Sequence, residues 1–211
     1  IVAVTNPTGG TVAIVDGRIH FTPDAGFNGT ARFEYTVRDN GTTNGSPDPR
    51  TDIGTVTYQV NPKADAPQVT PAITQEDTQS TSGLQITAAA ADGAAVTYFL
   101  VTGITGGSLY LHDGVTQIAD GTFITVAQAT AGLKFTPAPN FTGEAGFDVR
   151  ASLDAYGTGL GEKARTTVTV TEVNDAPSAQ DDVLAPVAED SGAYVIDFAT
   201  LLGNDHAGAN E

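Results

Sequence analysis

The sequence predicts an all-β protein made of tandem antiparallel β-sandwiches, and three observations lead to this fold class. Apolar residues alternate with polar ones at the period of two that is typical of strands, and no segment shows helical spacing. Glycine is frequent, with 24 residues among 211, and turn-forming segments separate short apolar runs. Long segments also recur about 110 residues apart, which is the size of one sandwich domain.

The first strands are expected around a two-residue hairpin turn. In TVAIVDGRIHFT, Asp16 and Gly17 lie between two apolar stretches, and their tolerance of positive φ suits a type I′ turn. Next in order, ARFEYTVRD places Phe33, Tyr35 and Val37 on one face of a strand. The later segments GTVTYQV and GFDVRAS alternate in the same way. These patterns predict half-buried strands with one face in a core.

Internal repeats relate these strands to each other. FTPDAGFNGTARFEYTV begins at Phe21, and FTPAPNFTGEAGFDVRA begins at Phe135, 114 positions later (135 − 21). VTNPTGGTVAI begins at Val4, and VTGITGGSLYL begins at Val101, 97 positions later (101 − 4). The later copy therefore carries an insertion of 17 residues (114 − 97), roughly TQIADGTFITVAQATAG.

The repeats divide the chain into three parts. Residues 1–67, the head unit, are the later part of a sandwich without its first strands. Residues 68–177, the middle unit, form a complete repeat, and residues 178–211, the tail, hold only the opening strands of another, notably AYVIDFATLLGND. The chain begins on Ile1 without a methionine, which indicates a piece of something longer.

An incomplete sandwich exposes a core face and an unpaired strand edge, which soluble proteins avoid. We therefore expect that the tail of one chain completes the head unit of another by strand addition, or that the segment is one period of a tandem array. Completion within one chain is disfavoured, because the middle unit should carry its two ends at opposite poles.

Composition restricts the functional classes. The chain carries 25 acidic and 9 basic residues, a formal charge of −16, so we expect no nucleic-acid partner. It has no cysteine, which excludes disulfides and thiolate metal sites. No apolar window is long enough to span a membrane, so we expect no membrane insertion. No serine, histidine or glycine motif supports catalysis, and the chain is expected not to be an enzyme.

Several segments carry a family resemblance: FTPDAGFNGTARFEYTVRDNG, FTPAPNFTG, VNDAPSAQDDVLAPVAEDS and LLGND. They resemble the cadherin-like tandem repeats of giant bacterial surface adhesins and biofilm proteins, which are exported by type I secretion and include RTX-adhesin and VCBS-like repeats. The resemblance implies extracellular or cell-surface immunoglobulin/cadherin-like sandwiches, strung end to end and stiffened by Ca²⁺ at their joints.

By position, the resemblance implies metal ligands at both joints and after one strand. The implied ligands are Asp65 with Glu76 and Asp77 at the first joint, Asn174, Asp175, Glu189 and Asp190 at the second, and Asp39 with Asn40. The family often follows LLGND with alternating aspartates, which NDHAGANE replaces here, so a site at Asn204 and Asp205 is not expected.

A physical argument for calcium stands beside the resemblance. Ca²⁺ binds six to eight oxygens, and it relieves the repulsion of carboxylates gathered by a turn. Asp175, Asp181 and Asp182 lie close together, and no Lys or Arg follows Arg165. The alternative is that these acidic loops only keep the protein soluble. Pro67 and Pro177 stiffen the joints in either case.

The function expected from these observations is structural. The chain is predicted to be a non-catalytic extracellular module that builds a stalk, fibre or filament for cell-surface adhesion or biofilm, with neighbouring copies as head-to-tail partners. The alternative is a module of a surface adhesin that binds a polysaccharide, peptide or other surface target through its loops, for which the 17-residue insertion is the candidate. An exposed aromatic pair or a loop pocket there would favour this alternative.

Overall fold

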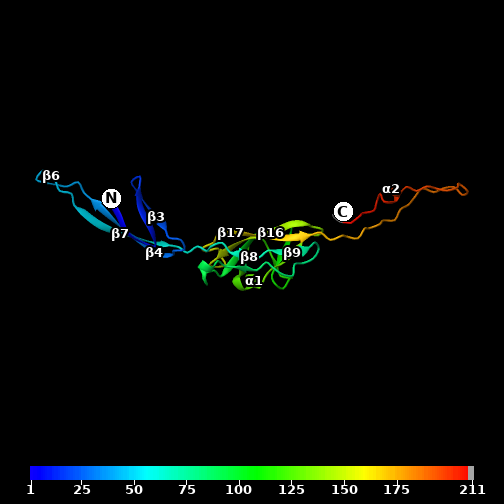
Figure 1. Ribbon diagram of the computed structural model, residues 1–211, viewed down its shortest axis with the longest axis horizontal. Coiled ribbons are helices and arrows are strands. Elements are labelled where there is room, and N and C mark those ends of the chain that lie inside the picture. Colours follow the sequence, from blue (N-terminus) through cyan, green and yellow to red (C-terminus); the bar gives the residue numbers. More distant parts are fainter. Residues whose placement is uncertain (209–211) are drawn as a thin grey trace.

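The protein consists of three segments that follow one another along its longest axis (Figure 1). The computed structural model describes residues 1–208; residues 209–211 lie outside the described part. The head unit lies at one end, the middle unit at the centre and the tail at the other end. The described chain is built mainly of strands, so the predicted all-β class is confirmed.

The middle unit is a β-sandwich. Its larger sheet has the strand order β14-β11-β16-β17-β9. The bounds are β14 Thr122–Thr125, β11 Tyr98–Thr105, β16 Gly143–Ser152, β17 Lys163–Thr171 and β9 Ala72–Gln75. The other strands form the sheet β13-β12-β15 and the pair β10-β8: β13 Gln117–Ile118, β12 Gly107–Tyr110, β15 Lys134–Pro137, β10 Ile86–Thr87 and β8 Gln68–Val69. The strand pairs of this unit are antiparallel, except that β17 and β9 run parallel.

The core of the middle unit lies between these sheets. Period-two alternation in β16 and β17 sends every second side chain inward, and Phe147, Val149 and Val168 have no exposed surface. Phe99 and Phe135 are equally buried. Since full burial of one such side chain stabilises a fold by about 1.5–3 kcal/mol, this apolar core is a major source of the stability of the middle unit.

The 17-residue insertion belongs to the sandwich. It supplies β13, β14 and the helix α1 (Val126–Thr130), and it buries Ile118, Ile124 and Ala129. A capping box starts α1: the Thr125 hydroxyl accepts a hydrogen bond from the N–H of Gln128, whose side chain accepts one from the N–H of Thr125. This helix does not change the all-β class, and at five residues it is too short to show a helical period in the sequence.

Two further short helical segments occur outside the insertion. The 3₁₀ helix η1 covers Ala90–Asp92 in the middle unit, and α2 covers Phe198–Leu201 in the tail. Neither buries a side chain. Each is a single turn, which hydrophobic periodicity cannot reveal.

The head unit has the sheet β1-β4-β7 and the hairpin β2-β3. The bounds are β1 Ala3–Thr8, β4 Gly29–Arg38, β7 Thr51–Val60, β2 Gly10–Val15 and β3 Arg18–Pro23, and a small hairpin pairs β5 Thr42–Thr43 with β6 Ser46–Pro47. The predicted turn between β2 and β3 is confirmed, with φ of 49° at Asp16 and 74° at Gly17. Phe21 packs against Phe33 and Tyr58, with ring centroids 6.3 and 5.0 Å away.

The repeat is visible in the strand pairing. Strands β1, β4 and β7 have the same order as β11, β16 and β17. The register of β1 against β4 shifts between Thr5 and Thr8, and that of β11 against β16 shifts between Thr102 and Thr105, 97 positions later (102 − 5). The head unit therefore has counterparts of the later strands of the middle unit, but the described residues 1–67 hold no counterpart of β9 or β14.

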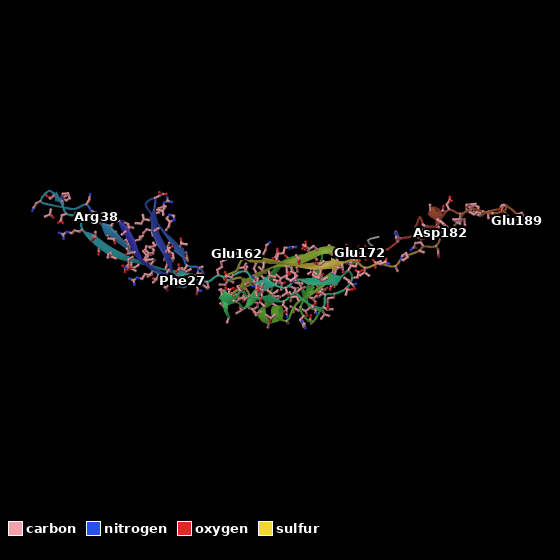
Figure 2. The ribbon with its side chains drawn as sticks, viewed as in Figure 1. Phe27, Arg38, Glu162, Glu172, Asp182 and Glu189 are labelled. Carbon is pink, nitrogen blue, oxygen red and sulfur yellow. The ribbon has the colours of Figure 1, made fainter. Side chains whose placement is uncertain are left out.

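The tail runs outward from the middle unit and returns (Figures 1 and 2). Within residues 178–208, its backbone pairing is the bridge between Ser178 and His206, and the structure assigns no strand there. Apolar side chains of the tail are exposed, and the largest exposed fractions are 97% for Val183, 82% for Val195 and 81% for Phe198. The tail thus has apolar residues without a core of its own.

Candidate functional sites at the joints

The first joint forms a cleft between the head and middle units. Its volume is about 450 Å³, and its lining includes Phe27, Asp65, Asp92 and Glu162. The backbone N–H of Asp65 donates to both carboxylate oxygens of Asp92, at 3.2 and 3.0 Å. Glu162 pairs with Lys63 across the cleft, and this contact lowers the pKa of the Glu162 carboxyl. Two of the three acidic groups at this joint therefore already have partners.

Glu76 and Asp77 lie at the other end of the middle unit, away from Asp65. Strand β9 runs parallel to β17, so the residues that follow β9 lie beside those that follow β17. The Glu76 side chain is 2% exposed and accepts a hydrogen bond from the N–H of Val173 at 2.7 Å. The Asp77 carboxylate accepts one from the N–H of Asn140 at 3.1 Å. The structure thus groups Glu76 and Asp77 with the second joint.

The second joint contains a carboxylate oxygen with an unusual environment. The Oδ2 atom of Asp175 is buried and has no hydrogen-bond partner in the described part of the chain. A buried, unpartnered carboxylate oxygen is costly, which favours a positive ligand at this position. The neighbouring Asn174 is exposed. Asp175 is therefore the predicted ligand that the structure supports best.

The acidic residues of the tail stand apart from this oxygen or stabilise the local backbone. Asp181, Asp182, Glu189 and Asp190 are exposed, and Figure 2 shows Asp182 and Glu189 along the extended part of the tail. The Asp205 carboxylate accepts from the N–H of Gln180 at 2.8 Å. It therefore holds the returning chain against the outgoing chain.

Asp39 and Asn40 lie at the base of the small hairpin in the head unit. The Asp39 Oδ1 atom accepts from the N–H groups of Arg50 at 2.8 Å and Gly41 at 3.1 Å. The pKa of Asp39 is lowered, mainly by the Arg50 N–H and then by that of Gly41. Asn40 is exposed. Asp39 therefore has a structural role in closing the hairpin.

Among residues 1–208, no three His, Asp or Glu side chains lie close enough together to hold a metal ion. The acidic residues named from the sequence are distributed over the two joints, the hairpin and the tail. Ca²⁺ needs six to eight oxygens, so these side chains form at most part of a site. Calcium binding remains a prediction.

Asp148 is the other buried carboxylate in the described chain besides Glu76, at 8% exposed. It pairs with Lys163 at 3.0 Å and with Arg165 at 3.3 Å, both from the adjacent strand β17. Its charge is thereby neutralised. Asp148 stabilises the sheet and offers no free acidic group for chemistry.

The apolar residues of the insertion pack into the sandwich. Ile118, Ile124 and Ala129 point into the core, and Phe123 is partly buried. The end of the insertion, at Ala131 and Gly132, lines a small cleft of about 280 Å³. Most of the insertion is therefore sandwich structure, which disfavours the ligand-binding alternative.

The repeats predict an unpaired strand edge in the head unit, and within residues 1–208 one edge of β7 has no strand partner. In the middle unit, β17 is flanked by β16 and β9, whereas its counterpart β7 is flanked by β4 alone. The repeat offsets are the sequence signal for this edge, since residues 1–67 hold no counterpart of the opening strands of the middle unit. The direction of the missing strand required the structure.

Comparison with known families finds a match within the head unit. The family described as bacterial Ig domain matches residues 1–57. No curated protein matches the chain. Residues 1–57 are thus similar to a bacterial Ig-like repeat, which agrees with the sandwich fold. No helix in residues 1–208 is long and apolar enough to cross a membrane.

Proposed function

We propose that the chain is a non-catalytic structural module of a bacterial extracellular or cell-surface protein. Its sandwiches follow one another as segments of a stalk, fibre or filament that serves adhesion to a surface glycan or protein, or biofilm formation. The match of residues 1–57 to bacterial Ig domains supports a repeat of this class. The observation that carries the proposal is the parallel pairing of β9 with β17.

This pairing suits a unit that bears tension. Ala72 at the start of β9 lies opposite Val168, and Gln75 at its end lies opposite Thr171 near the end of β17. Opposite pulls on the two ends of the middle unit therefore slide β9 and β17 along each other. Such a pull loads the hydrogen bonds between the two strands together, whereas an antiparallel terminal pair would open them one after another.

Single-molecule force spectroscopy on the full chain, held at its two ends, tests this role. The N–H of Glu76 donates to the carbonyl of Thr171 at 2.9 Å, so by alternation the N–H of Thr74 also faces β17 and that of Ile73 faces away. We expect Thr74→Pro to lower the unfolding force of the middle unit, since it removes a hydrogen bond from the loaded pair. We expect Ile73→Pro to leave the force nearly unchanged.

Thr74→Val is the matched control for the lost hydroxyl, which donates to the carbonyl of Thr78 at 2.8 Å. It keeps the backbone N–H and should retain most of the unfolding force. A middle unit that opens in several weak steps, or equal forces in the two proline variants, would contradict a tension-bearing role.

We further propose that Ca²⁺ stiffens the joints. At the second joint, Asp175, Asn174, Glu76 and Asp77 would contribute oxygens, and Asp65 would do so at the first. The buried, unpartnered Oδ2 of Asp175 supports this proposal. A bound cation would give this negatively charged oxygen a positive partner. Neighbouring copies of the chain are the proposed partners.

A further inference from the structure

The chain that connects the head and middle units is bound to the middle unit. Ala64 is 3% exposed and belongs to the core cluster of the middle unit. Its backbone N–H donates to the carbonyl of Gly159 at 2.8 Å. The next N–H, that of Asp65, donates to both carboxylate oxygens of Asp92, at 3.2 and 3.0 Å. The middle unit therefore satisfies two successive backbone donors of the connection.

These acceptors come from two elements that are distant in the sequence. Asp92 is the last residue of η1. The other acceptor lies in residues 153–162, which join β16 to β17 and are called the clamp loop here. The residues that they hold, 63–65, are called the linker segment. Lys63 adds an ion pair with Glu162 of the clamp loop, which Figure 2 labels at the joint. Both η1 and the clamp loop thus bind the linker segment.

A glycine of the clamp loop allows this close contact. A Cβ at Gly161 would lie 2.7 Å from the carbonyl oxygens of both Ala64 and Asp65. The three nearest atoms to that Cβ are all backbone atoms of the linker segment. The φ of Gly161 lies outside the left-handed range, so alanine suits the backbone conformation there. The missing side chain at Gly161 therefore serves the contact with the linker segment, not the shape of the loop.

The clamp loop is itself fixed to the body of the middle unit. The N–H of Gly161 donates to the carbonyl of Ala151 at 2.8 Å. Arg150 of β16 donates from Nε to the carbonyl of Gly161, also at 2.8 Å. Near the start of the loop, the Asp154 carboxylate accepts from two N–H groups of the loop. The linker segment is thus bound to a surface that is held in place by strand β16.

The binding of the linker segment restricts the hinge between the two units. Strand β7 ends at Val60 and the linker segment begins at Lys63, so Asn61 and Pro62 lie between them. Proline fixes its own φ and restrains the preceding residue to extended conformations. The cleft of about 450 Å³ at this joint gives the units room to bend towards each other. Their orientation therefore depends on how firmly the linker segment is held.

We propose that η1 and the clamp loop hold the linker segment so that the first joint keeps one orientation without a metal ion. Bending is then limited to Asn61 and Pro62, and the middle unit begins at Lys63 in the mechanical sense. The groups that bind the segment are carbonyls and side chains of the protein itself, so Ca²⁺ at Asp65 would add to a joint that is already oriented. The inference does not depend on the proposed surface role.

Spin labels on the two units measure this orientation. The chain has no cysteine, so Thr57→Cys and Thr169→Cys, at exposed positions of β7 and β17, place one label on each unit. Pulsed dipolar spectroscopy of the full chain in EDTA should give a narrow distance distribution. Gly161→Ala should broaden the distribution, because the added Cβ displaces the linker segment. Asp92→Ala, which removes the acceptor of the Asp65 N–H, should broaden it as well.

Two controls show whether the effect is specific to the clamp. Asp92→Asn keeps a side-chain oxygen that accepts a hydrogen bond, so its distance distribution should stay close to that of the wild type. Hydrogen exchange checks the fold of the variants. The Ala64 N–H should be protected in the wild type and lose this protection in Gly161→Ala. The N–H of Val149 in the central strand β16 should stay protected in both, because the core does not involve the clamp.

Two results would overturn the inference. The first is a broad distribution for the wild type in EDTA; if Ca²⁺ then narrows it, the ion sets the orientation of the joint. The second is a distribution that stays unchanged in both Gly161→Ala and Asp92→Ala. Neither result alters the force test of the structural role, because that test loads β9 against β17 within the middle unit.

Discussion

At the scale of single residues, the repeated Gly-Gly pair shows how much of the fold the sequence could predict. PTGGT and ITGGS indicate glycine turns between strands. The structure gives each glycine a separate reason: Gly9 and Gly106 both have φ of 76°, and a Cβ at Gly10 or Gly107 would lie 2.3 or 2.2 Å from a carbonyl of the adjacent strand. The turn could be predicted from composition, but the close approach depends on the neighbouring strand.

Asp154 carries a residue-scale prediction of pH dependence. Its carboxylate accepts from the N–H groups of Tyr156 and Thr158 at 2.8 and 3.0 Å, in the loop between β16 and β17. The pKa of Asp154 lies below its ordinary value of 3.8, mainly because of the Thr158 side chain and then the backbone N–H groups. Because folding lowers this pKa, the ionised carboxylate stabilises the folded state at pH values above the pKa of the unfolded state. This contribution is lost as the pH falls from about 3.8 through the pKa of the folded state.

We therefore expect Thr158→Val to raise the pKa of Asp154, measured by NMR titration of its carboxyl carbon, part of the way towards 3.8. In Asp154→Asn, the free energy of unfolding should fall less steeply as the pH decreases through this acidic range. Denaturant unfolding at a series of pH values measures this slope. An unchanged pKa in Thr158→Val would show that the hydroxyl is not the main cause.

At the scale of elements, the insertion shows what sequence reasoning could not decide. Its length and position were visible as the difference between two repeat offsets, and the T-x-x-Q pattern from Thr125 to Gln128 is a helix-start signal. Whether Ile118 and Ile124 face solvent or core depends on where β13 and β14 pair. Their pairing with β12 and β11 places them in the sandwich. The segment that the sequence offered as a candidate binding loop therefore contributes side chains to the core.

This assignment predicts a large effect of Ile124→Ala. Ile124 is 3% exposed within the core cluster, so truncation should lower the free energy of unfolding of the middle unit by about 2–5 kcal/mol. Val115→Ala, just before the insertion and 78% exposed, should change it by less than about 0.5 kcal/mol. Denaturant unfolding of both variants measures the difference. Equal, small effects would mean that the insertion packs loosely and is again a candidate binding loop.

At the scale of the whole molecule, strand direction decides which candidate ligands share a joint. By sequence position, the family resemblance groups Asp65 with Glu76, because both stand near the boundary of the first two units. Because β9 crosses the middle unit parallel to β17, Glu76 arrives beside Val173 at the far end. The acidic residues were visible in the sequence, whereas their grouping followed from a pairing direction that alternation does not report.

Calcium at the joints gives the last prediction. Ca²⁺ should raise the melting temperature of the chain and narrow the distribution of interdomain distances in small-angle scattering, and EDTA should reverse both. A ligand that binds only the folded state at a hundredfold excess over its Kd adds about 2.7 kcal/mol to stability.

Asp175→Asn should remove most of this response to Ca²⁺, because it removes the charge of the buried carboxylate. Asp39→Asn should leave the response intact, because the Asp39 carboxylate already accepts two backbone N–H groups at the hairpin. Identical melting and scattering with Ca²⁺ and with EDTA would show that the acidic joints act through proline stiffness and solvation alone.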